Sequence, residues 1–172
     1  DNLIFTPSVS NTTPTLSGTP TDITVTEDTA SNVDLSAVTF ADSDGDSLTA
    51  TLTASAGTLA ASSGGSVTVS GSGTGTLTLS GTAANINTYL DTASNVQYTG
   101  ASNASGGDAA TLSIKANDGT TDSSIATVNI DITAVNDIPV INILSDGTPS
   151  TTLNISEYID VQGDIAGVVD VD

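Results

Sequence analysis

The chain has 172 residues, of which 20 are Asp or Glu and only one is Lys or Arg, and its formal net charge is −19 at pH 7. It contains no His, Cys, Met or Trp, which excludes the usual Ser–His and Cys–His catalytic arrangements and any disulfide framework. This charge also excludes a nucleic-acid backbone or an anionic membrane as the natural partner and favours cations. No apolar run reaches the ~18 residues that insertion into a membrane as a helix requires. The composition therefore indicates a structural or binding protein rather than an enzyme.

The chain is rich in Thr and Ser, with 30 and 23 residues, and only 3% of it is aromatic. A disordered chain is one interpretation of such a composition. However, Val, Ile and Leu alternate with Thr and Ser along much of the sequence, which is typical of half-buried strands. We therefore expect a folded β domain.

Apolar residues at every second position predict seven strands, separated by turns that contain Gly and Asp. In chain order the strands cover residues 23–26, 48–54, 67–70, 76–80, 96–99, 111–116 and 125–135. Turns are expected at Asp44-Gly45, Gly64-Gly65, Gly106-Gly107 and Asp118-Gly119. One short helix is predicted over 83–90, with Thr82 as its N-cap. This pattern favours an all-β fold, an antiparallel β-sandwich with one short helix.

The sequence also repeats itself. Asn11-x-x-Pro14 recurs as Asn136-x-x-Pro139. Five further pairs agree at a constant offset of 130: Glu27 with Glu157, Asp34 with Asp164, Leu35 with Ile165, Val38 with Val168, and Asp42 with Asp172. The repeat predicts a linker or the end of a preceding repeat over 1–13, one sandwich over 14–136, and the beginning of a second repeat over 137–172. The last segment is either cut by a boundary inside a repeat or donated to the sandwich of a neighbour.

Three carboxylates share one predicted turn: Asp42, Asp44 and Asp46, with Gly45 between them. Like charges this close destabilise each other unless a cation is bound, and Ca2+ suits flexible oxygen ligands best. The turn matches the first three ligand positions of an EF-hand loop, but Ser47 and Thr53 replace its Gly and its bidentate Glu. A metal here therefore needs further ligands from elsewhere in the chain.

Other acidic and amide residues in turns could complete the metal shell, or could be ordinary turn formers. The candidates are Glu27, Asn117, Asp118, Asn136 and Asp137. Solvated turns are the preferred interpretation of Asp22, Asp91, Asp108 and Asp146. The sequence thus predicts that several loops meet at an end of the sandwich and hold Ca2+ there.

Several segments together resemble the tandem cadherin-like (Ig-like) repeats of giant bacterial surface and secreted proteins, which include RTX adhesins. These segments are residues 24–28 (TVTED), 41–46 (ADSDGD), 70–82, 84–87 and 132–139 (ITAVNDIP). The resemblance implies an Ig-like sandwich, calcium at repeat junctions and an adhesive role outside the cell or on its surface. It would place calcium ligands on Glu27, on Asp42 with Asp44, and on Asn136 with Asp137. The first junction departs from this pattern, because Asn11-Thr-Thr-Pro14 lacks the acid found at Asp137.

Two functions follow as alternatives. The chain is a calcium-stiffened spacer repeat whose partners are neighbouring repeats, or it is a filament subunit joined to identical subunits by strand donation. Binding of a surface glycan by the loops is a third alternative. Lys115 is expected to face solvent because it alternates with Ile114, and the alternative is an isopeptide bond to a nearby Asn or Asp.

Overall fold

The computed structural model describes residues 10–136, which contain eleven strands, one α-helix and one short 3-10 helix. The expected all-β fold is confirmed. A compact unit ends at Ala134, and a second unit begins at Val135, two residues before the boundary expected from the repeat. The predicted opening of a second repeat, at 137–172, lies outside the described residues.

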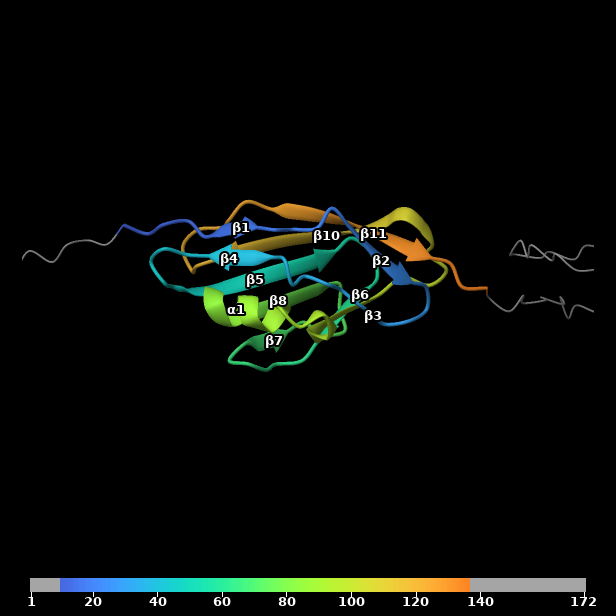
Figure 1. The fold of residues 1–172 in the computed structure, drawn as a ribbon, viewed down its shortest axis with the longest axis horizontal. Helices are drawn as coiled ribbons and strands as arrows, with labels where there is room; N and C mark the ends of the chain where they lie inside the picture. Colours follow the sequence, from blue (N-terminus) through green and yellow to red (C-terminus); the bar gives the residue numbers. More distant parts are fainter. Residues whose placement is uncertain (1–9, 137–172) are drawn as a thin grey trace, which may run out of the picture. The chain divides into compact units, whose positions relative to one another are not determined.

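Six strands form the larger sheet of the domain (Figure 1). Their order is β2 (Asp22–Thr26), β11 (Ala126–Thr133), β10 (Gly106–Asn117), β5 (Ser47–Ala54), β8 (Thr76–Thr82) and β7 (Thr68–Ser70). Neighbouring strands are antiparallel except β2 and β11, which pair in parallel. All seven strands predicted from alternation are present, six of them in this sheet and the seventh as β9 (Val96–Thr99).

Two smaller sheets complete the fold. One joins β1 (Thr15–Ser17) to β4 (Thr39–Ala41), and the other has the order β3 (Ser31–Asn32), β9, β6 (Thr58–Ala61). Alternation does not predict β1, β3, β4 or β6, which have two to four residues each. The predicted turn at Gly106-Gly107 is wrong: these residues begin β10, next to a shift in its register with β11.

The core consists of the inward side chains of the strands and is aliphatic. Along β5, Leu48, Ala50 and Leu52 are almost fully buried, while Thr49 and Thr53 point to the other face and are exposed. The smaller sheets and the loops between strands add Leu35, Phe40, Leu59 and Tyr98, each about 1% exposed or less. The alternation of Thr with apolar residues therefore creates one dry face and one wet face on each strand.

The helix α1 (Ala83–Leu90) has the predicted bounds and the predicted cap, since Thr82 Oγ1 accepts a hydrogen bond from the Asn85 N–H at 3.3 Å. Asn87 fastens α1 to β4: its side-chain oxygen accepts from the Phe40 N–H at 2.9 Å, and its amide donates to the Phe40 carbonyl at 3.0 Å. One side-chain amide therefore pairs with both backbone polar groups of Phe40, which need partners when they are buried.

The described chain enters and leaves the sandwich at opposite ends. Figure 1 shows the segment before β1 at one end, whereas β2 and β11 both finish at the other. The loops at the two ends are therefore separate candidate sites.

Candidate metal centre

The predicted acidic turn lies between β4 and β5. One carboxylate oxygen each from Asp42, Asp44 and Asp46 lies within 4.8 Å of the other two. Gly45 has a φ of +77°, which lets the chain turn sharply between the aspartates. Asp44 and Asp46 are exposed, and Asp42 is half-buried. The structure thus brings together the three carboxylates that the sequence singled out.

The two oxygens of Asp42 have different surroundings. Oδ1 accepts from the backbone N–H groups of Asp44, Gly45 and Asp46 at 2.9, 3.0 and 3.4 Å. Oδ2 is buried and has no hydrogen-bond partner within the described part of the chain. A buried carboxylate oxygen without a partner is costly, and an ion or an ordered water is its usual partner. The residues present therefore fit a cation bound at Asp42 Oδ2 with the carboxylates of Asp44 and Asp46.

The segment that precedes β1 also reaches this turn. The Thr12 N–H donates to Asp44 Oδ2, and the Thr12 hydroxyl donates to Asp44 Oδ1 at 3.3 Å. The side-chain amide of Asn11 donates to Asp118 Oδ2 at 2.9 Å. Residues 11 and 12 are adjacent, so Asp118 and the acidic turn lie at the same end of the sandwich.

Asp118 is only 8% exposed, and both of its oxygens are fully occupied. Oδ1 accepts from the Thr120 and Thr121 N–H groups at 2.7 Å each, and Oδ2 accepts from the Thr121 hydroxyl and from Asn11 at 2.9 Å each. The backbone hydrogen bond from Thr121 is the largest cause that holds the pKa of Asp118 far below its ordinary value. Asp118 therefore stabilises the turn between β10 and β11 without needing a metal.

Asn117 belongs to the same turn. Its side-chain oxygen accepts from the Gly119 N–H at 2.7 Å, and its amide donates to Asp122 Oδ1 at 2.8 Å. These contacts are those of an ordinary turn-forming asparagine. The side chains of Asn117 and Asp118 thus have partners of their own, unlike Asp42 Oδ2.

Glu27 lies at the opposite end of the sandwich. It is 4% exposed and follows β2, and its N–H donates to the carbonyl of Thr133, the last residue of β11. Asp118 lies beyond the opposite end of β11, past Ala126. The eight residues of β11 span about 25 Å, so at least this length of strand separates Glu27 from Asp118. Within this domain, Glu27 therefore does not meet the acidic turn.

The remaining predicted ligands follow β11. Asn136 is exposed and belongs to the unit that begins at Val135, and Asp137 lies outside the described residues. The predicted ligands thus divide into a group at the entry end of the domain and a group at its exit end.

A second acidic group was not expected from the sequence. Asp22, Asp108 and Asp131 each place a carboxylate oxygen within 4.8 Å of the others. The pairing of β2 with β11 sets Asp131 opposite Thr24, and the Asp108 N–H donates to Asp131 Oδ1 at 2.8 Å. The outward position of Asp131 could have been read from its alternation with Ile130 and Ile132, but its neighbours depend on strand order.

The single cation of the chain makes an ion pair. Lys115 Nζ lies 2.9 Å from Asp122 Oδ2, and the two side chains are 39% and 49% exposed. The hydrogen bond from Lys115 is the main cause of the lowered pKa of Asp122. Ile114 is buried and Lys115 lies on the other face of β10, as the alternation predicted.

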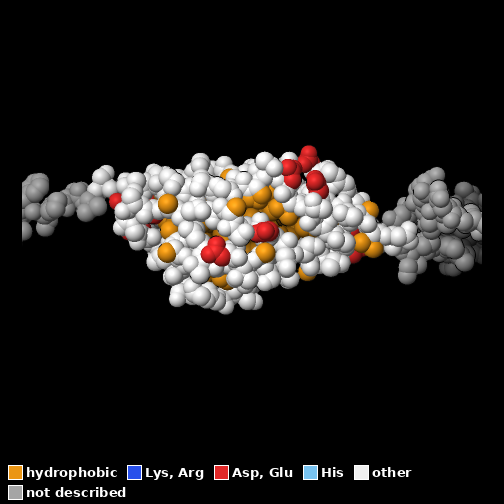
Figure 2. All heavy atoms as spheres, in the orientation of Figure 1, with side chains coloured by type: hydrophobic (Ala, Val, Ile, Leu, Met, Phe, Trp, Pro, Cys, Tyr) orange, Lys and Arg blue, Asp and Glu red, His pale blue; other side chains and the backbone are white. Residues whose placement is uncertain are grey.

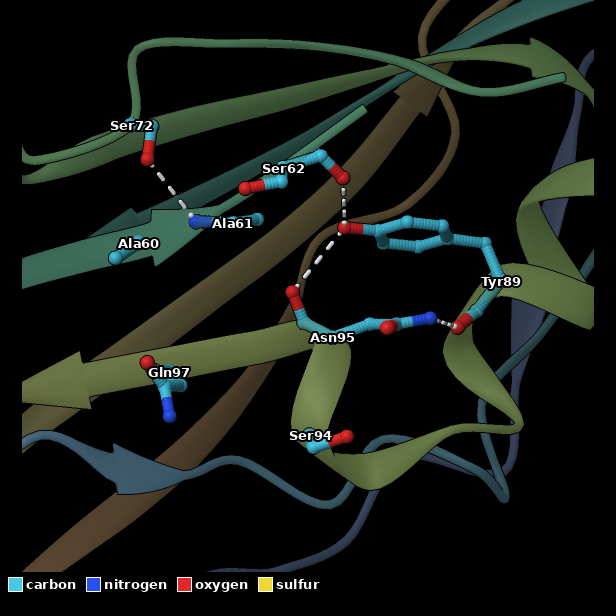
Figure 3. Close-up of a pocket in the computed structure, with 8 residues that line it drawn as sticks. All are labelled: Ala60, Ala61, Ser62, Ser72, Tyr89, Ser94, Asn95 and Gln97. Atoms are coloured by element: carbon cyan, nitrogen blue, oxygen red, sulfur yellow. Dashed lines mark hydrogen bonds between the residues drawn. The ribbon is translucent and has the colours of Figure 1, made fainter. Parts of the chain in front are cut away.

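A small polar pocket lies between α1, β6 and β9, with a volume of about 210 Å³ (Figure 3). The Tyr89 hydroxyl is engaged there by the carbonyls of Ser62 and Asn95, at 2.8 and 3.1 Å. The other residues that line the pocket are Ala60, Ala61, Ser72, Ser94 and Gln97. The lining holds neither a carboxylate nor an amine, so it offers no acid–base pair for catalysis.

Figure 2 shows acidic side chains in several separate places on the face in view, and no Lys or Arg among the described residues there. Within residues 10–136, no helix has the length and apolar character needed to cross a bilayer. No family model, curated protein or solved structure matches the chain. Function must therefore be argued from the geometry of the site.

Proposed function

We propose that this chain is a calcium-stabilised structural repeat of an extracellular bacterial adhesin, in which it acts as a rigid spacer and not as an enzyme. The observation that carries the proposal is Asp42 Oδ2, which is buried and has no hydrogen-bond partner within residues 10–136, beside the carboxylates of Asp44 and Asp46. Hydrogen-bond donors satisfy Asp42 Oδ1 and all of Asp118, so the missing partner is confined to one atom at the acidic turn.

Calcium is the cation that these donors favour. The three acidic side chains of the turn offer carboxylate oxygens, which are hard ligands of the kind that Ca2+ prefers. Asp42, Asp44 and Asp46 would hold the ion, and their mutual repulsion would be neutralised. When bound, the ion supplies positive charge to the loop that connects β4 to β5, and the folded domain is stabilised by mass action.

The entry and exit of the chain at opposite ends of the domain support the proposed spacer function. Because the chain enters beside the acidic turn and leaves beside Glu27, a tandem neighbour would bring its own acidic turn toward the Glu27 end (Figure 1). The resemblance stated above implies calcium ligands at Glu27 and at Asn136 with Asp137, and this part of the proposal rests on that resemblance. A cation shared between consecutive repeats would restrict bending, which is what a spacer requires.

The test is thermal unfolding of the 172-residue chain across a calcium titration, with chelator as the zero point and light scattering recorded in parallel. At a hundredfold excess over the Kd, calcium should add about 2.7 kcal/mol of stability. This corresponds to a rise in Tm of roughly 10 °C for a domain of this size. Asp46→Asn should remove most of the rise, because it deletes one anionic ligand from the turn.

Asp91→Asn is the matched control, since Asp91 is exposed and belongs to neither acidic group. It should leave the calcium response unchanged. A Tm that is the same in chelator and in calcium would refute the calcium proposal. A rise in scattering with wild-type protein would instead favour the filament subunit, and removal of residues 140–172 should then abolish it.

A further inference from the structure

The segment 11–13, called here the entry segment, is held by two loops that are distant in sequence. Thr12 donates twice to Asp44, 32 residues away, and Asn11 donates to Asp118, 107 residues away. Asn11 also donates to the Thr121 hydroxyl at 3.2 Å. Both carboxylates thus receive donors from this short stretch, immediately before the buried Pro14.

The residue types of the entry segment suit these acceptors. The donors are the backbone N–H and hydroxyl of Thr12 and the side-chain amide of Asn11. Because each of these neutral groups donates to a charged carboxylate, the hydrogen bonds are charge-assisted and stronger than those between two neutral groups. In the repeated motif the counterpart of Thr12 is Asp137. A carboxylate at position 12 would face Asp44 and would need a cation between them, whereas Thr12 needs none.

We propose that the carboxylates of Asp44 and Asp118 form a docking surface for the entry segment, which fixes the direction in which the chain enters the domain without a cation. The proposal deepens the proposed spacer function, on which its biological meaning rests. The entry segment of this repeat is then held in place by hydrogen bonds to Asp44 and Asp118.

Docking and cation binding at the acidic turn do not exclude each other. A carboxylate has about four acceptor positions, and Thr12 occupies two of those on Asp44. Asp42 Oδ2 and the carboxylate of Asp46 remain available to an ion, since neither accepts from the entry segment. The order of the entry segment and the response of the Tm to calcium can therefore be measured separately.

The test is backbone 15N relaxation of the full chain in chelator. We expect order parameters at Asn11, Thr12 and Thr13 near the rigid value of about 0.85. Asn11→Ala removes the contact with Asp118, and Asp44→Ala removes both acceptors of Thr12. Each should lower the order parameters of the entry segment toward about 0.6 while the amides of β5 and β10 stay rigid.

Two further variants sharpen the test. Thr13→Ala is the matched control and should change nothing, because Thr13 is exposed and its side chain makes no hydrogen bond in the described structure. Thr12→Asp should loosen the entry segment in chelator, since it places a like charge against Asp44. Low order parameters in wild-type protein, or unchanged ones in both Asn11→Ala and Asp44→Ala, would overturn the docking proposal. These outcomes do not depend on whether calcium raises the Tm, so failure of docking is distinguishable from failure of the calcium proposal.

Discussion

Polar side chains in the interior of this domain differ in whether their atoms have partners. Asp118 accepts four hydrogen bonds, and the hydroxyl of Tyr98, which is 1% exposed, donates to the Ala56 carbonyl at 3.0 Å. Asp42 Oδ2 is the contrasting atom, buried without such a partner among the described residues. Paired groups stabilise the fold, and the unpaired oxygen points to a ligand.

Tyr98 should make stability sensitive to alkaline pH. Burial raises the pKa of its hydroxyl above the ordinary value of 10.0. Below about pH 10 the folded and unfolded chains are both neutral at this group, so its contribution is constant. At higher pH the unfolded chain ionises first, and the free energy of unfolding falls as pH rises toward the folded pKa.

The measurement is Tm from about pH 8 to about pH 11, for wild type and Tyr98→Phe. The variant loses one hydrogen bond and so has a lower Tm at neutral pH, but its decline above about pH 10 should be shallower. Every other titratable residue is the same in both proteins, so the difference in slope isolates Tyr98. Parallel slopes would contradict the expectation.

Among the elements, α1 is attached to the sandwich differently from the strands. Strand pairs such as β10 with β11 are joined by backbone ladders, whereas α1 contacts β4 through the Asn87 side chain. The helix has only two turns, which is too short to be stable alone in water. Its stability therefore depends on burial of Ile86, Tyr89 and Leu90 and on the contact through Asn87.

Asn87→Ala should lower the free energy of unfolding by about 2–3 kcal/mol, because it leaves the N–H and carbonyl of Phe40 unpaired in a partly buried place. Chemical denaturation in chelator measures this value. Thr88→Ala, at the exposed next position of the helix, is the control and should be within about 0.5 kcal/mol of wild type. Equal stability of the two variants would show that the amide does not fasten the helix.

At the scale of the whole molecule, self-repulsion is the dominant electrostatic feature. The formal charge is −19, and the only basic side chain is paired with Asp122. Repulsion among exposed carboxylates opposes the compact state, and it weakens as salt shortens the Debye length. Calcium at the acidic turn would act locally, while monovalent salt acts on the whole surface.

The Tm in chelator should rise when sodium chloride is increased from about 0.01 M to about 0.15 M, since the Debye length falls from ~30 Å to ~8 Å. Tetramethylammonium chloride should give the same rise, because screening does not require a fitted site. Wild type and Asp46→Asn should respond alike to both salts and differ only in calcium. A Tm that does not change with salt would show that the surface charges are too far apart to matter.

The local patterns of the sequence were enough for much of the fold. Alternation identified the strands of the large sheet, and Thr82 with the residues that follow it identified α1, since these signals depend on neighbours within a few residues. The short strands β1, β3, β4 and β6 were missed because they are held by their partners rather than by a period of their own. The start of β10 at Gly106-Gly107 was predicted as a turn because a Gly-Gly pair is common both in turns and in bulged strands.

For the candidate site, the sequence by itself determined that Asp42, Asp44 and Asp46 share one turn, because residues two apart around a glycine cannot be far from one another. Only the tertiary structure decided what lies beside them. It placed Thr12 against Asp44, gave both oxygens of Asp118 hydrogen-bond donors and set Glu27 at the far end of β11. It also left Asp42 Oδ2 buried without a partner among the residues that the structure describes. These outcomes depend on strand order and on contacts up to 110 residues apart, which a local pattern does not encode.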